Sequence, residues 1–246
     1  MGRLDNKVAV VIGGTSGLGE ATAKMFSKED AKVAVVGTNE AHAQSIVTDI
    51  EKENGEAIFV QMDITNTASV KDGVDKIVKE YGTIDVLYNG AGIHDAYNNI
   101  IETDEADFDK LMDVNVKGPY LVTKAIMPIL LDKGKGSIIN VGSQSTFVAG
   151  AGGNTYVTSK HAISGFTKQL AYDFGHKGIK SNLIAPGFIE TPMTEGIQDE
   201  RLKDIPAGRA GKPDEIAAVA VFLASDESDY MQGAEIKVDG GWTVGR

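Results

Sequence analysis

The chain has no cysteine among its 246 residues, and it has only six prolines and one tryptophan. The absence of cysteine excludes a disulfide scaffold, thiolate catalysis, a zinc–thiolate site and an iron–sulfur cluster. Positive charge is also scarce, because 24 Lys and Arg residues face 35 Asp and Glu residues and leave a formal net charge of −11. A surface of this sign repels phosphate backbones and anionic membranes, so we expect no nucleic-acid partner.

Long apolar segments are missing as well. The longest runs are short, such as Val8–Ile12 and Ala217–Leu223, whereas a membrane helix needs about 20 apolar residues. The first residues show no signal-peptide pattern either. We therefore expect a soluble, cytoplasmic protein that has no membrane partner.

Glycine, in contrast, is abundant. The chain has 29 glycines among 246 residues, about 12%, against an average of roughly 7%. Because proline is so rare, this surplus is typical neither of collagen nor of a linker. It predicts a compact fold with many tight turns and close backbone approaches.

Two kinds of segment alternate along the chain. Short runs rich in β-branched residues predict buried parallel strands, and they are Val8–Ile12, Lys32–Val36, Ala57–Gln61, Asp85–Tyr88, Ser137–Val141, Lys180–Ile184 and Glu235–Val238. Stretches with helical periodicity separate them, and these are Leu18–Ser27, Ala41–Asn54, Ser69–Tyr81, Glu105–Leu131 (with an interruption), Thr155–Phe174 and Asp214–Ala224. The alternation predicts one α/β domain over residues 1–246, with a seven-stranded parallel sheet covered by helices on both faces. Residues 191–211 lack this pattern, and we expect them to form an excursion on the surface.

A glycine-rich loop follows the first predicted strand. It reads Gly13-Gly14-Thr15-Ser16-Gly17-Leu18-Gly19 and leads into a predicted helix. One glycine permits a tight turn, another lets the backbone approach a pyrophosphate, and the third lets the helix sit close to the strand with its N-terminus toward the phosphates. The loop therefore predicts a dinucleotide site, although a glycine-rich turn without a ligand has the same pattern.

The end of the second predicted strand carries the signal for the choice between NAD and NADP. An NAD site usually has a carboxylate here and an NADP site a cation, but position 37 is glycine and no Arg or Lys occupies Ser16, Thr38 or Asn39. Thr38 and Asn39 can hydrogen-bond either ribose group. The missing carboxylate at Gly37 favours NADP slightly, Glu40 opposes it, and a plain polar turn is the alternative.

Asp63 and Ile64 follow the third predicted strand. The Asp63 carboxylate could accept a hydrogen bond from an adenine amino group while Ile64 lies against the ring. It could equally form an Asx turn.

A tyrosine and a lysine stand four residues apart at the start of a predicted helix, in Tyr156-Val157-Thr158-Ser159-Lys160. Residues at this spacing share a helix face. A nearby ammonium favours the phenolate, so we expect Lys160 to lower the pKa of Tyr156 and to tune it for proton transfer. Ser143 follows a predicted strand and therefore lies at the carboxyl edge of the sheet, where ligands bind. As a bare pattern, the Tyr–Lys spacing is also typical of a surface pair.

Seven motifs in order, read together, resemble the short-chain dehydrogenases/reductases. They are the glycines of 13–19, Asn89-Gly90-Ala91-Gly92, Asn115 in Val114-Asn115-Val116-Lys117-Gly118, Ser143, Tyr156-x-x-x-Lys160, Pro186-Gly187 and Val238-Asp239-Gly240-Gly241. The resemblance covers residues 4–244. It implies a Rossmann-type fold and an NAD(P)-dependent oxidoreductase.

The resemblance also implies roles for the motif residues. Tyr156 is the expected general acid or base, Lys160 lowers its pKa and holds the nicotinamide ribose, and Ser143 binds the substrate oxygen. Asn115 breaks the helix of 105–131 and holds a water next to Lys160. The expected cofactor contacts are Gly13, Thr15, Ser16, Gly17, Leu18, Gly19, Gly37, Thr38, Asn39, Asp63, Ile64, Asn89, Gly90, Ala91, Gly92, Tyr156, Lys160, Pro186, Gly187, Ile189 and Thr191. The excursion of 191–211 becomes a substrate lid.

Two residues depart from the family pattern. Ile12 stands where the family usually has threonine, and Gly90 stands where it usually has a second asparagine. The strands that carry them are neighbours in this fold. We hypothesise that the two changes are coupled, so that apolar packing replaces a polar tie between the strands.

The expected substrate pocket includes His94, Ser143, Gln144, Ser145 and Phe188. This polar and partly aromatic set favours a small or medium substrate with more than one oxygen, although His94 can instead be a solvated loop residue. We expect no metal site, since the histidines show no ligand spacing.

Three functions remain open at this point. A dehydrogenase of small ketones, sugars or polyols ranks first. A 3-oxoacyl-acyl-carrier-protein reductase ranks second, because Lys135 and Lys177 form only a weak basic patch for an acidic carrier protein. A dinucleotide-binding sensor without catalysis is the third. The resemblance further implies a homotetramer.

Overall fold

The computed structural model describes residues 2–197 and 200–245. Its seven strands form one parallel sheet in the order β3-β2-β1-β4-β5-β6-β7. They are β1 (Val8–Ile12), β2 (Lys32–Gly37), β3 (Glu56–Gln61), β4 (Val86–Asn89), β5 (Gly136–Val141), β6 (Ile179–Pro186) and β7 (Glu235–Val238). The predicted α/β fold with a seven-stranded parallel sheet is confirmed, and β1 and β7 match their predicted bounds.

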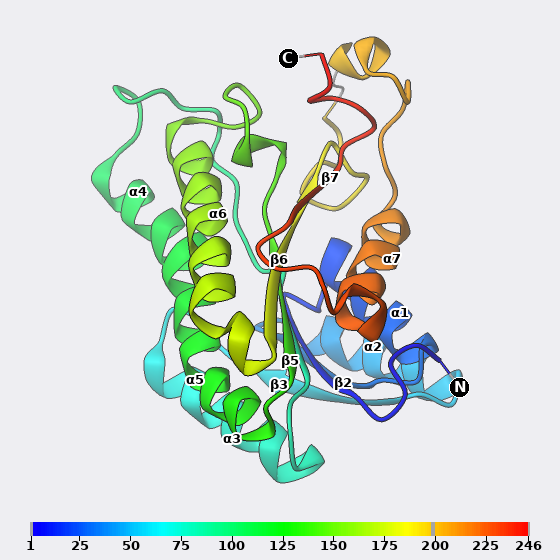
Figure 1. The fold of residues 1–246 in the computed structure, drawn as a ribbon. Helices are drawn as coiled ribbons and strands as arrows, with labels where there is room; N and C mark the ends of the chain where they lie inside the picture. Colours follow the sequence, from blue (N-terminus) through cyan, green and yellow to red (C-terminus); the bar gives the residue numbers. More distant parts are fainter. Residues whose placement is uncertain (1, 198–199, 246) are drawn as a thin grey trace.

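Helices cover both faces of the sheet (Figure 1). Those of the first layer are α1 (Gly17–Lys28), α2 (Glu40–Lys52) and α7 (Pro213–Ala224). Those of the second are α3 (Thr67–Tyr81), α4 (Glu105–Met112), α5 (Gly118–Lys133) and α6 (Asn154–Phe174). All five residues of β1 are buried. Its alternate residues face opposite layers, so that Val11 packs in the core with Phe26 of α1 and Val10 in the core with Ile126 of α5.

β1 and β4 are neighbours at the centre of the sheet. From β1 the next strands are added toward β3, and from β4 they are added toward β7, so the strand order reverses between these two strands. In open α/β sheets, ligands bind at the carboxyl ends of the strands beside such a reversal. The loops after β1, β4, β5 and β6 meet there, and they carry the motifs singled out in the sequence.

The predicted break in the helix of 105–131 is confirmed. A π-helical turn over Asp113–Lys117 separates α4 from α5, and Asn115 lies at its centre. π-turns inside helices are frequent at functional sites because they re-aim one side chain.

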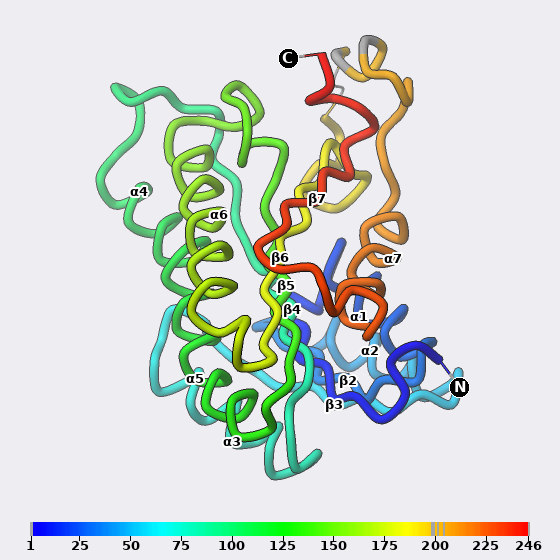
Figure 2. The backbone as a smooth tube through the Cα atoms, viewed as in Figure 1, coloured from blue at the N-terminus to red at the C-terminus, as the bar shows by residue number. Residues whose placement is uncertain are grey.

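Residues 191–197 and 200–211 form the predicted excursion above the carboxyl edge, drawn yellow to orange in Figure 2. Gly211 closes its base, because its N–H donates to the Phe188 carbonyl and its carbonyl accepts from the Glu190 N–H, both at 2.9 Å. Positions 198–199 of the expected lid lie outside the described residues.

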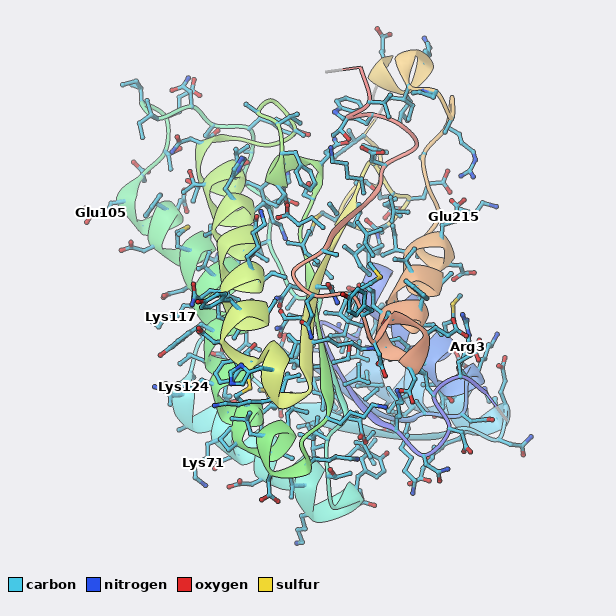
Figure 3. All side chains as sticks on the ribbon, viewed as in Figure 1. Arg3, Lys71, Glu105, Lys117, Lys124 and Glu215 are labelled. Carbon is cyan, nitrogen blue, oxygen red and sulfur yellow. The ribbon has the colours of Figure 1, made fainter. Side chains whose placement is uncertain are left out.

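Charged side chains cover the outer faces of both helical layers. Lys117 and Lys124 project from the layer that contains α5, and Glu215 lies at the start of α7 (Figure 3). Within the described ranges, none of the helices has the length and apolar character needed to cross a bilayer.

Candidate active site

The glycine loop packs tightly between β1, β4 and α1. Gly13 has a φ of +74°, and a Cβ on it would lie 2.7 Å from the Ala91 nitrogen. A Cβ on Gly19 would lie 2.1 Å from the Gly13 carbonyl oxygen, so the close approach of α1 requires glycine. Gly17 also has a positive φ, +52°, and faces Thr191. The loop therefore brings the excursion after β6 against the start of α1.

The N-terminus of α1 is open to a ligand. Ser16 precedes the helix, is exposed, and makes no side-chain cap bond. The first N–H groups of a helix have no partner within it, and together with the helix dipole they bind phosphate groups well. This end of α1, with Leu18 on the adjoining cleft, fits a pyrophosphate.

Gly37 is explained by its neighbour Thr15. A Cβ at position 37 would lie 2.6 Å from the Thr15 methyl carbon, so a carboxylate side chain could stand here only if Thr15 moved. Thr38 is exposed. Asn39 caps α2, because its side chain accepts from the His42 N–H at 3.1 Å.

Asp63 forms an Asx turn, which is one of the two alternatives that the sequence allows. Its Oδ1 accepts from the N–H and the hydroxyl of Thr65, at 2.9 and 2.7 Å, which lowers the pKa of the Asp63 carboxyl. Ile64 is buried and points toward Gly118 at the start of α5, where a Cβ would lie 2.5 Å from its Cδ1. The expectation that the Ile64 side chain lies open to an adenine ring is therefore corrected.

Asn89 is a buried link between strands, and its expected contact with the cofactor stays a prediction. Its Nδ2 donates to Asn140 of β5 at 2.9 Å and to Thr123 of α5 at 3.2 Å. Asn140 in turn donates to Thr167 of α6. This network ties the central strands to the second helical layer.

Ile12 and Gly90 are direct neighbours, as the coupling hypothesis requires. The Gly90 N–H donates to the Ile12 carbonyl at 3.0 Å, and Ile12 is buried in the core. A Cβ at position 90 would lie 2.3 Å from a ring carbon of Tyr88. Gly90 is thus needed for the buried Tyr88 ring, so apolar packing occupies the place of a polar tie.

The structure brings Ser143, Tyr156 and Lys160 together in a cleft at the carboxyl edge with a volume of ≈ 150 Å³. Ser143 comes from the loop after β5 and the other two from the first turns of α6. The cleft is lined by Leu18, Gly90, Gly92, His94, Tyr97, Val141, Gly142, Ser143, Gln144, Ala151, Tyr156, Lys160, Pro186, Gly187, Phe188, Ile189, Thr191, Met193, Thr194 and Ile197.

Lys160 is a buried ammonium without a carboxylate partner in the part of the chain that the structure describes. Its Nζ donates to the Val141 carbonyl at 3.0 Å, and 6% of the residue is exposed. Burial disfavours the charged form and lowers the pKa of Lys160 to about 8. The side chain therefore remains mostly protonated at neutral pH and presents its charge to the cleft.

Tyr156 departs from its predicted ionisation. Burial raises its pKa to about 12, and Tyr97 and Asp95 add to this effect, while the Ser143 side chain opposes it. The Lys160 nitrogen lies 5.5 Å from the ring centroid. The predicted net lowering of the Tyr156 pKa is therefore wrong for this state, because the i, i+4 spacing predicts the nearby lysine but not the loss of solvent around the phenol.

Asn115 holds the loop that follows β4. Its Oδ1 accepts from the Ile93 N–H at 2.8 Å, and its Nδ2 donates to the Ile93 carbonyl at 2.9 Å and to Ser159 at 3.1 Å. A Cβ on Gly92 would lie 3.3 Å from the same Oδ1 and 3.7 Å from the Lys160 nitrogen. Glycine at 92 therefore leaves space beside the two polar groups.

The expected substrate residues divide into two groups. His94, Gln144 and Phe188 line the cleft. His94 is no solvated loop residue, because its ring packs at a tilt against Tyr156 with centroids 4.3 Å apart. Ser145 is corrected: it is fully buried, does not line the cleft, and donates to the Ala151 carbonyl at 2.9 Å.

Gln144 carries an unsatisfied polar atom. The residue is 7% exposed, and its side-chain oxygen is buried with no hydrogen-bond partner in the described structure. A buried acceptor of this kind costs free energy unless a ligand donates to it. Gln144 is thus an acceptor beside the cleft that the described protein groups leave unsatisfied.

The loop after β6 provides the remaining wall. Pro186, Gly187, Ile189 and Thr191 all line the cleft. A Cβ on Gly187 would lie 2.7 Å from the Asp239 Cα. Only glycine at position 187 therefore lets the chain after β7 pass this close. These positions can still hold a nicotinamide ring with main-chain groups.

Two contacts near Tyr156 escape sequence reasoning. The Asp95 carboxylate accepts from the Gly153 and Tyr156 N–H groups at 2.7 and 2.9 Å, and a Cβ on Gly152 would lie 2.5 Å from the Tyr156 ring. In the sequence, the only sign of the Asp95 contacts is that an aspartate follows the Asn89–Gly92 motif.

Across the described residues, no group of three or more His, Asp or Glu side chains has an arrangement that could hold a metal.

Comparisons with known proteins agree over nearly the whole chain. A family model described as enoyl-(acyl carrier protein) reductase matches residues 13–243. The chain is 39% identical over 247 residues to the 3-oxoacyl-[acyl-carrier-protein] reductase FabG of Thermotoga maritima, covering 98% of this chain and 100% of that protein. It is 38% identical over 247 residues to the 2,5-dichloro-2,5-cyclohexadiene-1,4-diol dehydrogenase LinX of Sphingobium indicum, covering 99% and 98%. The crystal structure of levodione reductase superposes with a TM-score of 0.94 at 29% identity, covering 99% of this chain and 100% of that one.

Proposed function

Because this chain belongs to the short-chain dehydrogenase/reductase family, we propose that it transfers hydride reversibly between NAD(P) and a ketone or secondary alcohol, with Tyr156 as the acid and base. One observation carries this proposal. A tyrosine hydroxyl, a serine and an unpaired buried lysine converge on one cleft at the carboxyl edge. A group of this kind is expensive to bury without a chemical use.

The nicotinamide, when bound, supplies or accepts the hydride. The residues of this chain handle the proton and the charge on oxygen. Protonated Tyr156 donates its hydroxyl proton to the ketone oxygen during reduction, and the Tyr156 phenolate accepts the proton of the alcohol during oxidation. Ser143 donates a hydrogen bond to the same oxygen. The Lys160 charge favours the tyrosinate that reduction leaves behind.

The dinucleotide is proposed to lie along the carboxyl ends of β1, β2 and β4. The open start of α1 supports a pyrophosphate there, and Asp63 keeps Oδ2 without a partner in the described structure for an adenine amino group. Thr15 lies where a carboxylate at position 37 would stand. Since nothing at Gly37 repels a 2′-phosphate, we infer a preference for NADP over NAD.

We infer that the substrate is a ring-bearing secondary alcohol or ketone with a second oxygen. The rings of His94, Tyr97 and Tyr156 form an aromatic wall of the cleft, with His94 centred 5.0 Å from Tyr97 and 4.3 Å from Tyr156. The buried Gln144 oxygen suits a second hydroxyl. LinX, which is named for a cyclohexadiene-diol, is 38% identical to this chain.

Reduction of acyl-carrier-protein thioesters is the second candidate, favoured by the likeness to FabG. An acidic carrier protein needs a basic surface beside the cleft. Lys135, one of the two expected cations, instead lines a cavity among the amino ends of the strands and pairs with Asp226 at 3.0 Å. This placement ranks the carrier-protein substrate below the cyclic alcohol.

The test compares substrates and cofactors in one assay. Nicotinamide absorbance is followed with cyclohexanediols, a matching cyclic hydroxyketone, an acyclic ketone and an acetoacetyl-carrier-protein thioester, each with both cofactors. We expect the ring substrates and NADP to give the highest kcat/KM. Higher kcat/KM with the thioester would favour the second candidate. Tight cofactor binding without turnover of any substrate would favour a sensor and contradict the proposal.

We also propose that the chain assembles as a homotetramer and that residues 191–211 act as a lid. Strand β7 lies at the edge of the sheet, and its residues are half-buried or exposed, unlike the fully buried β6. Tyr172 of α6 is 83% exposed. These surfaces suit contacts between copies, and sedimentation as a monomer at micromolar concentration would contradict the assembly.

A further inference from the structure

The start of α6 is capped by a side chain from a distant part of the sequence. Gly153 precedes the helix and has no side chain with which to cap it. Asp95 takes this place, because its Oδ1 accepts from the Gly153 N–H at 2.7 Å and its Oδ2 from the Tyr156 N–H at 2.9 Å. Tyr156 is the third residue of α6, and the N–H at this position has no partner within a helix.

The helix and the loop can approach each other only because residue 153 is glycine. A Cβ there would lie 2.6 Å from the Asp95 Oδ2 and 2.7 Å from the Asn98 nitrogen. The Asn154 N–H also donates to the Asn98 carbonyl at 3.0 Å. The contact is therefore formed by a carboxylate, a main-chain bond and a missing side chain together.

The same loop is fixed at its other end by the active site. Asn115 binds both the N–H and the carbonyl of Ile93. Between this anchor and Asp95 lies His94, whose ring packs against the Tyr156 ring. The loop of 93–98 thus joins the π-helical turn to the helix start that carries the reacting hydroxyl.

We propose that Asp95 is a positioning residue of this enzyme, which holds the main chain of Tyr156 and the adjoining His94 ring in one fixed arrangement over the cleft. The proposal rests on the proposed function for its kinetic consequences. A displacement of about 1 Å at a reacting group can cost on the order of 100-fold in rate, so this cap acts on catalysis as well as on folding.

The charge of Asp95 has a second effect on Tyr156. The ionisable groups that face Tyr156 are Lys160 from α6 and His94, Asp95 and Tyr97 from the loop. Burial contributes most to the raised pKa of Tyr156, and Tyr97 and the Asp95 carboxylate raise it further. Asp95 therefore favours the protonated tyrosine, which is the form that donates to a ketone.

Two variants remove the contact in steps, and a third controls for the loss of a helix cap. Asp95→Asn removes the charge and keeps one of the two acceptor oxygens, while Asp95→Ala removes both acceptors. Asn66→Ala is the matched control, because Asn66 caps α3 by accepting from the Ala68 and Ser69 N–H groups at 2.9 and 3.1 Å and does not line the cleft.

The kinetic readout is kcat for ketone reduction across a range of pH. We expect Asp95→Ala to lower kcat by about 10- to 100-fold, and both Asp95 variants to move the alkaline limb of the profile to lower pH. Asn66→Ala should lower the melting temperature without changing either quantity. Asp95 variants that lose only thermal stability, as Asn66→Ala does, would overturn the proposal.

A second readout needs no substrate. The Tyr156 phenolate is titrated by ultraviolet absorbance, as the difference between each protein and the same protein carrying Tyr156→Phe. The Asp95→Asn background should ionise at lower pH than the wild-type background, and an unchanged titration would contradict the charge effect. If the wild type turns over no substrate, the proposed function fails while this titration still decides the role of Asp95.

Discussion

Two buried lysines at opposite edges of the sheet show how differently the molecule treats the same side chain. Lys180, among the amino ends of the strands, donates to Asp229 at 2.9 Å and to Ser228 at 2.8 Å. Lys160, at the carboxyl edge, has a single carbonyl as its acceptor. Burial lowers the pKa of both, but for Lys180 the carboxylate of Asp229 opposes that effect.

The surroundings of the two lysines differ in the same way. The cavity at the amino edge, ≈ 320 Å³, is larger than the ≈ 150 Å³ cleft beside Lys160. Its charges are nevertheless paired, since Lys7 and Lys135 both contact Asp226 at 2.7 and 3.0 Å. Within the described residues, an unpaired buried charge, and not cavity size, therefore distinguishes the carboxyl edge from the amino edge.

The largest expected effect comes from replacing each lysine with methionine. Lys160→Met should lower kcat by about 10²- to 10⁴-fold without loss of stability. Lys180→Met should leave kcat within a few-fold and lower the free energy of unfolding by about 1–3 kcal/mol, because it leaves buried acceptors unsatisfied. Steady-state kinetics and urea unfolding of both variants check this, and a large kcat loss in Lys180→Met would remove the distinction.

Two serines of the loop after β5 sharpen the comparison within the catalytic edge. Ser143→Ala should lower kcat by about 10²- to 10³-fold, the cost typical of one lost donor to a reacting oxygen. Ser145→Ala should leave kcat within a few-fold, because the Ser145 hydroxyl donates to Ala151 and does not line the cleft. An equal loss of kcat in the two variants would show that kcat depends on the conformation of the loop and not on the Ser143 hydroxyl.

The pH dependence of stability gives a smaller effect with a definite sign. Folding lowers the pKa of Lys160 from 10.5 to about 8, so the buried ammonium destabilises the folded state below pH 8, and this cost disappears between pH 8 and 10.5. Lys160→Met should thus be more stable than the wild type by up to about 3 kcal/mol at pH 7 and by little above pH 10.5. Urea unfolding at both pH values measures the difference, and a pH-independent difference would contradict a buried charged lysine.

The sequence predicts the sheet well because parallel strands buried on both faces read as continuous β-branched runs, as Val8–Ile12 does. The spacing of the motifs also predicts correctly that Ser143, Tyr156 and Lys160 lie at one edge of the sheet. The sequence does not predict Asp95, whose partner Tyr156 lies 61 residues along the chain. Nor does it predict the raised pKa of Tyr156, because desolvation depends on everything packed around the phenol.

The central claim is that the Tyr156 hydroxyl transfers the proton. Its most direct test measures kcat/KM for reduction of a cyclic ketone by wild type, Tyr156→Phe and Tyr88→Phe. Tyr88 is the matched control, because it is another fully buried tyrosine whose pKa burial raises to about 12, and it does not line the cleft. We predict a loss of about 10²- to 10⁴-fold for Tyr156→Phe and a change of only a few-fold for Tyr88→Phe. Wild-type activity in Tyr156→Phe would contradict the account.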